Sequence, residues 1–247
     1  MEFGEGCRAH APSRLVAWTS NNRISEEELK ELQSRFSEVV EISPERLRRA
    51  RSAWAPTSVM IRSLGRRVPA DWVARELRAQ GKLSYDVEVF IMAAGFLTVR
   101  FRSQEDRDAA LENGPWLVAG QLLAMEQWKA NFVLGVNTVS RTVVWIRLPC
   151  LPLEYWERES ILDIAAAAGR PLAVDYCTAQ LQKLGYARVK VEINAITLLK
   201  LGTFIQREEQ RFWQAFVYEN LPAFCFSCAR IGHLESSCQF AVEGPIG

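Results

Sequence analysis

Three thiols and one imidazole fall close together near the C-terminus, in the stretch from Cys225 to Cys238. The spacing is C-x2-C-x4-H-x4-C, with Cys228 and His233 as the inner members. Zn²⁺ prefers four tetrahedral nitrogen or sulfur ligands, so this set satisfies the ion and leaves no open position for catalysis. A stretch this short buries too little apolar surface to fold alone, and metal binding would supply about 10–16 kcal/mol of folding free energy. We therefore predict a structural Zn²⁺ site.

The competing interpretation is a set of scattered structural cysteines beside a chance histidine. It is weaker, because half of the six cysteines and one of the two histidines stand in this register. Cys7, Cys150 and Cys177 have no metal-like spacing, and we interpret them as buried or incidental thiols.

The spacing resembles the retroviral-type zinc knuckle, a module that grips unpaired bases of single-stranded nucleic acid. By that resemblance Phe226 and Leu234 would form the apolar cleft for a base, and Arg230 would face phosphate. The family usually has glycine after the second cysteine, where this chain has Ala229. The resemblance implies single-stranded RNA or DNA as the partner.

No catalytic motif accompanies these ligands in the sequence. There is no Tyr-x-Asp-Asp polymerase motif, no G-x-x-x-x-G-K-[ST] phosphate loop and no G-x-S-x-G elbow. Of the two histidines, His233 is assigned to zinc and His10 lies in a tail that we expect to be disordered. Carboxylate pairs such as Asp106 and Asp108 stand two apart on a predicted helix and face different ways. We expect a protein that is not an enzyme and has no small-molecule substrate.

Length and composition set the class of protein. The 247 residues allow one large domain or two small ones, and 49% hydrophobic residues provide ample material for a core. No apolar run of about eighteen residues occurs, so we expect no membrane association. The stretch Met1–Ala11 carries charges and no apolar segment, so it is not a secretory signal. The nucleus or cytoplasm follows, where cysteines stay reduced.

The formal net charge of +1 is not that of a strong general nucleic-acid binder, but the charges are unevenly distributed. Seven arginines and no acidic residue lie between Arg46 and Arg67. Such a cluster attracts phosphate. A solvated face with ion pairs to the acidic stretch Glu26–Glu28 explains the pattern equally well, and the sequence leaves both interpretations open.

Residues 1–54 are predicted as an N-terminal arm, disordered over residues 1–21 and carrying two helices, Glu26–Val40 and Pro44–Ala53. Ser25 and Glu28 have capping-box spacing at the first helix. The second helix begins with a proline at its first position, which is favourable there. The arm would pack on the next domain or bind a partner.

Residues 55–130 are predicted as an α+β domain. Strand and helix periodicities alternate in the order β-α-β-β-α-β, which is the ferredoxin-like arrangement also used by RNA-recognition motifs (RRM). The predicted strands are Val59–Leu64, Tyr85–Met92, Gly95–Phe101 and Leu122–Trp128, and the predicted helices are Pro69–Gln80 and the segment from Ser103, its cap, to Asn113.

One face of this RRM-like sheet is a second candidate binding surface. The alternation places Phe96 and Arg100 on the face away from the helices, beside Met60 and Arg62 of the first strand. One ring flanked by two arginines would offer single-stranded nucleic acid a small stacking platform, and each stacked base contributes about 1–3 kcal/mol. Alternatively, the N-terminal helices or the next domain cover this face and Phe96 serves in packing. The sequence favours neither.

Residues 141–222 are predicted as a second α+β region whose β-α-β-β run loosely repeats the first, and residues 223–240 as the knuckle. The predicted elements are strands Arg141–Leu148, Pro171–Tyr176 and Ala187–Ile193 and helix Glu154–Ala168. Phe212–Tyr218 fits a strand by its aromatic residues and a helix by the preceding glutamates. Tyr218–Phe224 is expected to couple the knuckle to the body as a short, stiff connection.

The order of motifs resembles a plant family that pairs a domain of unknown function with a CCHC knuckle. The stretches that carry the resemblance are Glu112–Trp116, Trp145–Pro149, Leu151–Trp156 and Tyr218–Cys225. The family domain usually stands at the N-terminus of LINE-type retroelement proteins and their domesticated relatives. The resemblance covers roughly Ala55 to Cys238 and implies RNA or single-stranded DNA binding in a retrotransposon-derived protein.

Two hypotheses follow for the function. In the first, the knuckle and the RRM-like sheet hold single-stranded RNA or DNA. In the second, the knuckle is a small protein-interaction module that zinc holds in shape and that contacts a protein partner without binding nucleic acid directly. The near-neutral charge and the absence of Lys or Arg after Cys238 favour the second, whereas the knuckle spacing and the arginine cluster favour the first.

Overall fold

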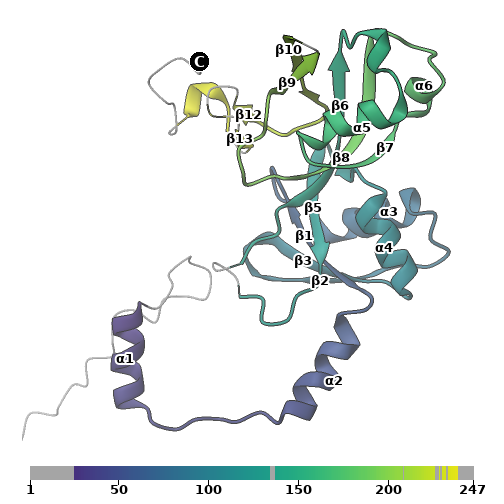
Figure 1. Ribbon diagram of the computed structural model, residues 1–247. Coiled ribbons are helices and arrows are strands. Elements are labelled where there is room, and N and C mark those ends of the chain that lie inside the picture. The colour runs from purple at the N-terminus through teal and green to yellow at the C-terminus, as the bar shows by residue number, and fades with distance from the viewer. Residues whose placement is uncertain are drawn as a thin grey trace, which may run out of the picture. The chain divides into compact units, whose positions relative to one another are not determined.

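A computed structural model describes residues 25–133, 137–207, 209–225, 228, 230–231 and 233–238 (Figure 1). The predicted disorder of residues 1–21, together with His10, lies outside this range. The described residues fall into two compact units, one reaching to Glu41 and including Phe132–Thr138, the other containing Ile42–Asn131 and Val139 onward. None of the helices in the described part is long and apolar enough to span a membrane.

The smaller unit contains helix α1, Glu26–Arg35. The predicted capping box is present, because the Ser25 hydroxyl accepts from the Glu28 N–H and the Glu28 carboxylate accepts from the Ser25 N–H. The helix ends five residues before the predicted Val40, and Phe36 is already extended. The apolar side chains Leu29, Leu32 and Phe36 are exposed, so no buried contact stabilises a further turn of β-branched residues.

The larger unit begins with helix α2, Pro44–Trp54, which has no buried residue. It continues into a five-stranded antiparallel sheet with the order β2-β3-β1-β5-β4. Its elements are β1 Ser58–Ser63, α3 Ala70–Gln80, β2 Glu88–Ile91, the 3₁₀ turn η1 Ala93–Gly95, β3 Phe96–Arg100, α4 Gln104–Glu112, β4 Leu117–Val118 and β5 Gln121–Gln127. Without the short β4, which the sequence did not predict, the strand order is that of the predicted ferredoxin-like fold.

The core of this first sheet lies between its strands and helices α3 and α4 (Figure 1). The register places Val59 opposite Val99 and Ile61 opposite Leu97, so these four side chains share one face. They pack with Val73 and Leu77 of α3 in a cluster that we call the first core. The period-2 alternation of β1 and β3 therefore identified the helix-covered face correctly.

The second sheet has four antiparallel strands in the order β11-β6-β8-β7. Its elements are β6 Arg141–Pro149, the 3₁₀ turn η2 Leu153–Tyr155, α5 Arg158–Ala166, β7 Arg170–Val174, α6 Tyr176–Ala179, β8 Tyr186–Asn194, the hairpin β9 Gly202–Arg207 and β10 Gln210–Ala215, and β11 Val217–Tyr218. Taken in chain order, its strands β6, β7, β8 and β11 occupy the same places as β1, β2, β3 and β5 in the first sheet. Along the chain, the β9–β10 hairpin lies between the third and fourth strands of the second sheet, where the first sheet has helix α4.

Two local predictions for this region are corrected, and one open alternative is decided. The helix predicted at Glu154–Ala168 starts as a 3₁₀ turn, because Pro152 precedes it and the Trp156 indole N–H donates to the Leu151 carbonyl at 2.9 Å. The strand predicted to reach Tyr176 ends at Val174, because Asp175 caps the short helix α6. Phe212–Tyr218, for which the sequence left strand and helix open, is a strand region interrupted at residue 216. Its first part, β10, pairs with β9, which the sequence did not predict, and its second part, β11, pairs with the predicted strand β6.

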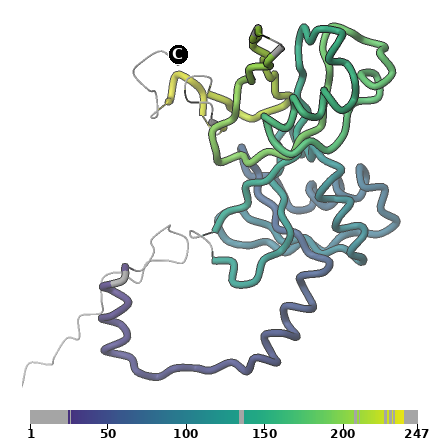
Figure 2. Tube along the Cα trace, in the orientation of Figure 1, coloured from purple at the N-terminus to yellow at the C-terminus, as the bar shows by residue number. Residues whose placement is uncertain are grey.

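The inner face of the second sheet carries what we call the second core. Alternate residues of β8 are buried, and they meet alternate residues of β6 and the apolar face of α5. Its fully buried members include Val144, Ile146, Leu148, Ile161, Ala187, Val189 and Val191. The colour gradient of Figure 2 lets the reader follow the chain from β5 into β6 and onward to this sheet.

Candidate functional site: the metal centre and its surroundings

The four predicted ligands come together at the end of the described chain. A two-stranded hairpin, β12 Phe224–Cys225 and β13 Arg230–Ile231, places Cys225 opposite Arg230. The 3₁₀ turn η3, Glu235–Ser237, then brings Cys238 back to the hairpin. The ligand atoms of Cys225, Cys228, His233 and Cys238 all lie within 4.8 Å of one another.

The donor set fits a tetrahedral metal ion. Zn–S bonds of about 2.3 Å and Zn–N bonds of about 2.0 Å place the ligand atoms of such a site roughly 3.5–3.8 Å apart. The Cys228 Sγ and the His233 Nε2 are 3.3 Å apart, so Nε2 is the imidazole atom that faces the thiols. Cys225 and Cys228 are buried, whereas His233 and Cys238 are half-buried. Three soft thiolates and one imidazole leave no position for a catalytic water.

The knuckle packs on the body of the larger unit. Phe224 and Ile231 from its hairpin are half-buried against the second core, as are Tyr218 and Leu221 of the connection. The Tyr218 hydroxyl donates to the Lys200 carbonyl at 2.8 Å, and burial raises its pKa. The connection is therefore short and anchored at several points.

Glu219 is a further anchor of this connection. Its carboxylate accepts from Arg147 Nε at 2.6 Å and from Arg188 Nη2 at 2.8 Å, while its N–H donates to the Trp145 carbonyl at 2.8 Å. Burial by itself would raise the pKa of Glu219. The hydrogen bonds and attraction of the two guanidinium groups outweigh burial, and the pKa is lowered from its ordinary value.

The predicted base-binding residues of the knuckle are only partly described. Leu234 is 58% exposed, which is unusual for an apolar side chain in so small a folded segment. Phe226 lies outside the described residues. The backbone of Arg230 is described in β13 but its side chain is not.

The outer face of the first sheet differs from the open stacking platform that one interpretation of the sequence predicted. Phe96 is only 7% exposed, and Met60 and Thr98 beside it are buried as well. Arg62 lies over the Phe96 ring at 5.8 Å. Arg100 pairs with Glu88 and lies over the rings of Trp54 and Phe90. This burial agrees with the alternative interpretation, in which Phe96 serves in packing, and it removes the expected stacking ring.

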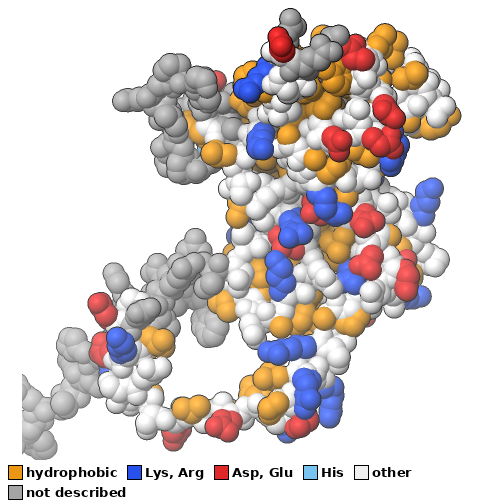
Figure 3. Space-filling view, in the orientation of Figure 1, with side chains coloured by type: hydrophobic (Ala, Val, Ile, Leu, Met, Phe, Trp, Pro, Cys, Tyr) orange, Lys and Arg blue, Asp and Glu red, His pale blue; other side chains and the backbone are white. Residues whose placement is uncertain are grey.

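The arginine cluster divides between three places in the larger unit, and one of them is β1, where Arg62 lies over the Phe96 ring. Arg46, Arg48, Arg49 and Arg51 are exposed on α2, and blue side chains gather over this helix in Figure 3. Of these, Arg48 pairs with Glu45 at 3.3 Å.

Arg66 and Arg67 lie instead in the exposed loop after β1. The adjacent Gly65 approaches Pro222 of the knuckle connection, since a Cβ at Gly65 would lie 3.5 Å from the Pro222 Cβ. Two cations are therefore carried on a loop that contacts the segment leading into the knuckle.

The outer face of the second sheet holds a network that the sequence reasoning missed. Arg188 and Lys190 of β8 lie over the Trp145 ring at 4.1 and 5.5 Å, and Arg147 lies over Tyr186 at 4.6 Å. The signal was present in β8, where charged residues alternate with Ala187, Val189 and Val191. The contact of Glu219 with these arginines could not be predicted. Glu219 is far from them in the sequence, and no local pattern indicates that it lies against this face.

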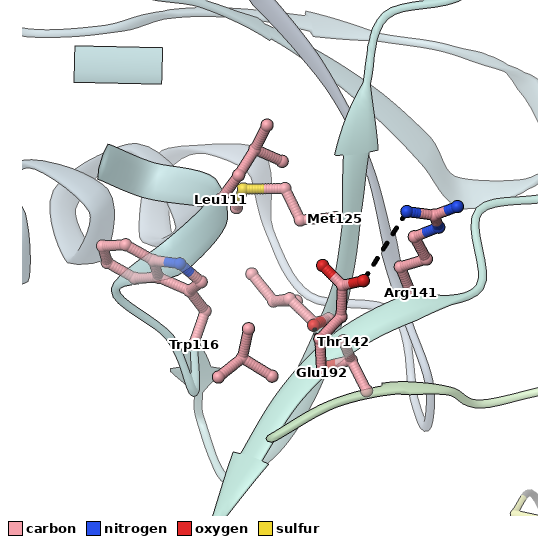
Figure 4. Close-up of a pocket in the computed structure, with 8 residues that line it drawn as sticks. Leu111, Trp116, Met125, Arg141, Thr142 and Glu192 are labelled. Atoms are coloured by element: carbon pink, nitrogen blue, oxygen red, sulfur yellow. Dashed lines mark hydrogen bonds and ion pairs between the residues drawn. The ribbon is translucent and has the colours of Figure 1, made fainter. Parts of the chain in front are cut away.

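A shallow pocket lies where β5 and α4 meet the start of β6 (Figure 4). Leu111, Trp116 and Met125 form its apolar side, and Glu192 faces Arg141 at 3.6 Å across its mouth. The space holds about one water molecule, so we assign it no ligand.

Comparison with known proteins assigns two parts of the chain. Residues 62–135 match the family model described as a domain of unknown function, DUF4283. Residues 202–240 match a model described as a zinc knuckle. The chain carries a DUF4283 domain and a CCHC-type zinc knuckle. The DUF4283 match covers most of the first sheet, the knuckle match begins at β9, and residues 136–201 belong to neither.

One curated relative is an uncharacterized protein of Arabidopsis thaliana, 28% identical over 142 residues. The alignment covers 56% of this chain and 44% of that protein, so the chain spans less than half of the relative's length. Among solved structures, the RNA binding domain of Hrp1 in complex with RNA is 10% identical with a TM-score of 0.25, covering 56% of this chain and 81% of that one. The Caenorhabditis elegans NONO-1 homodimer is 16% identical with a TM-score of 0.24, covering 57% and 51%.

Proposed function

We propose that the DUF4283–knuckle chain binds single-stranded RNA or DNA and that Zn²⁺ in the Cys225–Cys238 set holds the binding module in shape. The observation that carries this proposal is the convergence of three thiols and one imidazole on one point, with no open position. Bound zinc would fix the hairpin and the η3 turn, and the residues between the ligands, Leu234 among them, would contact the base. We propose no enzymatic activity for the chain.

Electrostatic support comes from the loop that carries Arg66 and Arg67. Residues 239–247 carry no Lys or Arg, whereas this loop offers basic side chains in the described part of the chain. The approach of Gly65 to Pro222 brings the start of this loop beside the knuckle connection, and the exposed Arg66 follows directly, whereas the Arg67 side chain lies against Gly95. Because each phosphate contact on a single strand adds about 0.7 to the salt slope, so few contacts predict a shallow dependence of affinity on salt.

Removal of one metal ligand tests this proposal. Cys228→Ser should lose stoichiometric zinc and weaken binding of short fluorescein-labelled single-stranded oligonucleotides by on the order of tenfold or more, as expected for one lost base contact. Fluorescence anisotropy at low and moderate salt measures the affinity, and atomic absorption measures the zinc.

Cys177→Ser is the matched control, because it makes the same chemical change in α6, outside the ligand set. The proposal is contradicted if Cys228→Ser binds the oligonucleotides as tightly as the parent protein. It is also contradicted if the parent protein binds no single strand. Nucleic acid that co-purifies with the parent protein and leaves in a high-salt wash would support it.

A protein-interaction role is the second candidate, and helix α1 specifically favours it. Leu29 and Leu32 lie at helical spacing on α1, the extended Phe36 follows directly after the helix, and all three side chains are exposed. Such an apolar stripe is typical of a helix that docks into a partner. Pull-down that survives nuclease treatment and is lost in Leu32→Glu would favour this role, and a purely nuclease-sensitive complex would count against it.

The relation to retroelement proteins and the location in nucleus or cytoplasm belong to the same proposal. Retroelement RNA would be the natural ligand of a chain with this order of domains. Crosslinking in cells followed by sequencing of the bound RNA tests that ligand, and imaging of the tagged protein tests the location.

A further inference from the structure

The β9–β10 hairpin presents two different faces. Its inner face carries Ile205, which packs against the second core, and Phe212, whose ring is 5.4 Å from that of Tyr155. Gln214 on the same face is buried and donates to the Pro149 carbonyl at 3.0 Å. The hairpin is therefore held on the body by one face, and its other face is left without such a role.

The outer face carries an exposed aromatic pair. Phe204 and Trp213 stand opposite each other in the register, with ring centroids 5.0 Å apart in an edge-on arrangement. Phe204 is 67% exposed and Trp213 is 50% exposed. An isolated exposed aromatic residue needs no explanation, but two of them paired across neighbouring strands form a specific apolar surface.

The Trp213 indole packs closely against the backbone at Gly202. A Cβ at this position would lie 2.5 Å from Trp213 Cζ2 and 2.6 Å from its Cε2. The ring therefore rests directly on the backbone of β9, where any larger residue would displace it. An aromatic ring held in this way loses little conformational entropy when a planar group stacks on it.

The next pair along the same face is polar. Arg211 stands opposite Gln206 and donates from its Nε to the amide oxygen at 2.7 Å. A guanidinium group has five N–H donors, and this bond uses one of them. An aromatic surface with a cation beside it suits a single strand, in which bases and phosphates alternate.

The hairpin and the knuckle also belong to one structural body. Ile205 of the hairpin and Ile231 and Phe224 of the knuckle all pack against the second core. The zinc-knuckle match covers both, from residue 202 to residue 240. In Figure 1 the β9–β10 hairpin and the β12–β13 hairpin both lie on the left-hand side of the second sheet.

We propose that the outer face of the β9–β10 hairpin is a base-stacking site, in which Trp213 and Phe204 receive an unpaired base and Arg211 its phosphate. This inference rests on the proposed function and extends it, since the same strand would run from the knuckle onto the hairpin. A peptide ligand suits the face less well, because the apolar surface is only two rings wide and is bounded by Arg211 and Gln206.

The test compares single-residue variants of the full chain by fluorescence anisotropy with labelled oligouridine and oligothymidine. Trp213→Ala should weaken binding by on the order of 5- to 100-fold, the range measured for loss of one stacked base, while Trp213→Phe should restore most of the affinity. Arg211→Gln should weaken binding and reduce the salt slope by about 0.7. Tyr176→Ala, which removes another exposed aromatic side chain of the same region, should change nothing.

The outcomes separate this inference from the proposed function. Loss of affinity in Cys228→Ser with none in Trp213→Ala overturns the hairpin site and leaves the knuckle as the binding module. Loss in Trp213→Ala with none in Cys228→Ser supports the hairpin site and overturns the role of the knuckle. If no single strand binds the parent protein, both fail. Circular dichroism of each variant shows that the fold is retained.

Discussion

Two arginines and one carboxylate hold the segment before the knuckle in place. Glu219 bridges Arg147 of β6 and Arg188 of β8, and Arg188 also pairs with Asp175 at 3.0 Å. The hydrogen bond to Glu219 raises the pKa of the Arg188 guanidinium, so both cations remain charged. Because these partners lie on different strands, one carboxylate links the sheet to the chain that enters the metal site.

The lowered pKa of Glu219 makes this link sensitive to acid. The folded-state pKa lies below the ordinary 4.5, so the carboxylate stabilises the fold above about pH 4.5 and this stabilisation is lost as the pH falls through the folded-state value. Glu219→Gln should cost about 1–2 kcal/mol at neutral pH, and the difference from the parent protein should shrink in acid. Urea unfolding at a series of pH values measures this dependence.

Glu159→Gln is the control for that series, since Glu159 is exposed and its 3.9 Å pair with Arg158 should contribute little. A difference between Glu219→Gln and the parent protein that grows as the pH falls would contradict the assigned sign.

At the scale of elements, capping residues decided where several helices begin. Ser103 accepts from the Asp106 N–H at 3.0 Å and starts α4 where the sequence predicted it. Helix α5 lacks such a cap, since Glu157 makes no side-chain capping bond, and here the predicted start was wrong. Local hydrogen bonds of this kind are readable from sequence because both partners lie within one turn.

The α4 cap gives a direct stability prediction. Ser103→Ala should destabilise the larger unit by about 1 kcal/mol, because the Asp106 N–H loses its acceptor. Ser52→Ala removes a hydroxyl that bonds within the exposed helix α2 and should cost much less. Thermal and urea unfolding of both variants measure the two effects, and equal effects would show that the cap contributes nothing.

At the scale of the whole larger unit, one buried carboxylate joins the two sheets. Glu126 at the end of β5 accepts from the N–H groups of Ser140 and Arg141 at 2.8 and 3.1 Å and contacts Lys129. Burial alone would raise its pKa, but these donors lower the pKa overall. Leu122 of β5 belongs to the second core, so the sheets share apolar contacts as well.

Glu126→Gln should loosen this junction. The amide keeps the volume but loses the charge that the buried Ser140 N–H and the part-buried Arg141 N–H face, which should cost about 1–3 kcal/mol. Hydrogen exchange should quicken at the amides of Ser140 and Arg141 before it changes in the strands. Glu88→Gln, at an exposed ion pair, serves as the control, and equal protection of these amides in the variant and the parent protein would contradict the proposed junction.

The sequence by itself determined the features that depend on near neighbours. The ligand spacing from Cys225 to Cys238 indicated the metal site, and alternation in β1 and β3 indicated which face enters the first core. Capping residues gave the starts of α1 and α4. All of these depend on residues within one or two turns of each other, where geometry follows directly from local backbone periodicity.

Only the tertiary structure decided the features that depend on distant partners. The burial of Phe96 results from packing on the outer face of the first sheet, which strand alternation cannot reveal. The bridge from Glu219 to Arg147 spans 72 positions, and the exposure of Trp213 depends on which face of β10 meets the second core. Pairing between distant segments is a property of the assembled chain. Because such pairing buries Phe96 and leaves Trp213 exposed, the candidate stacking surface is the β9–β10 hairpin and not the first sheet.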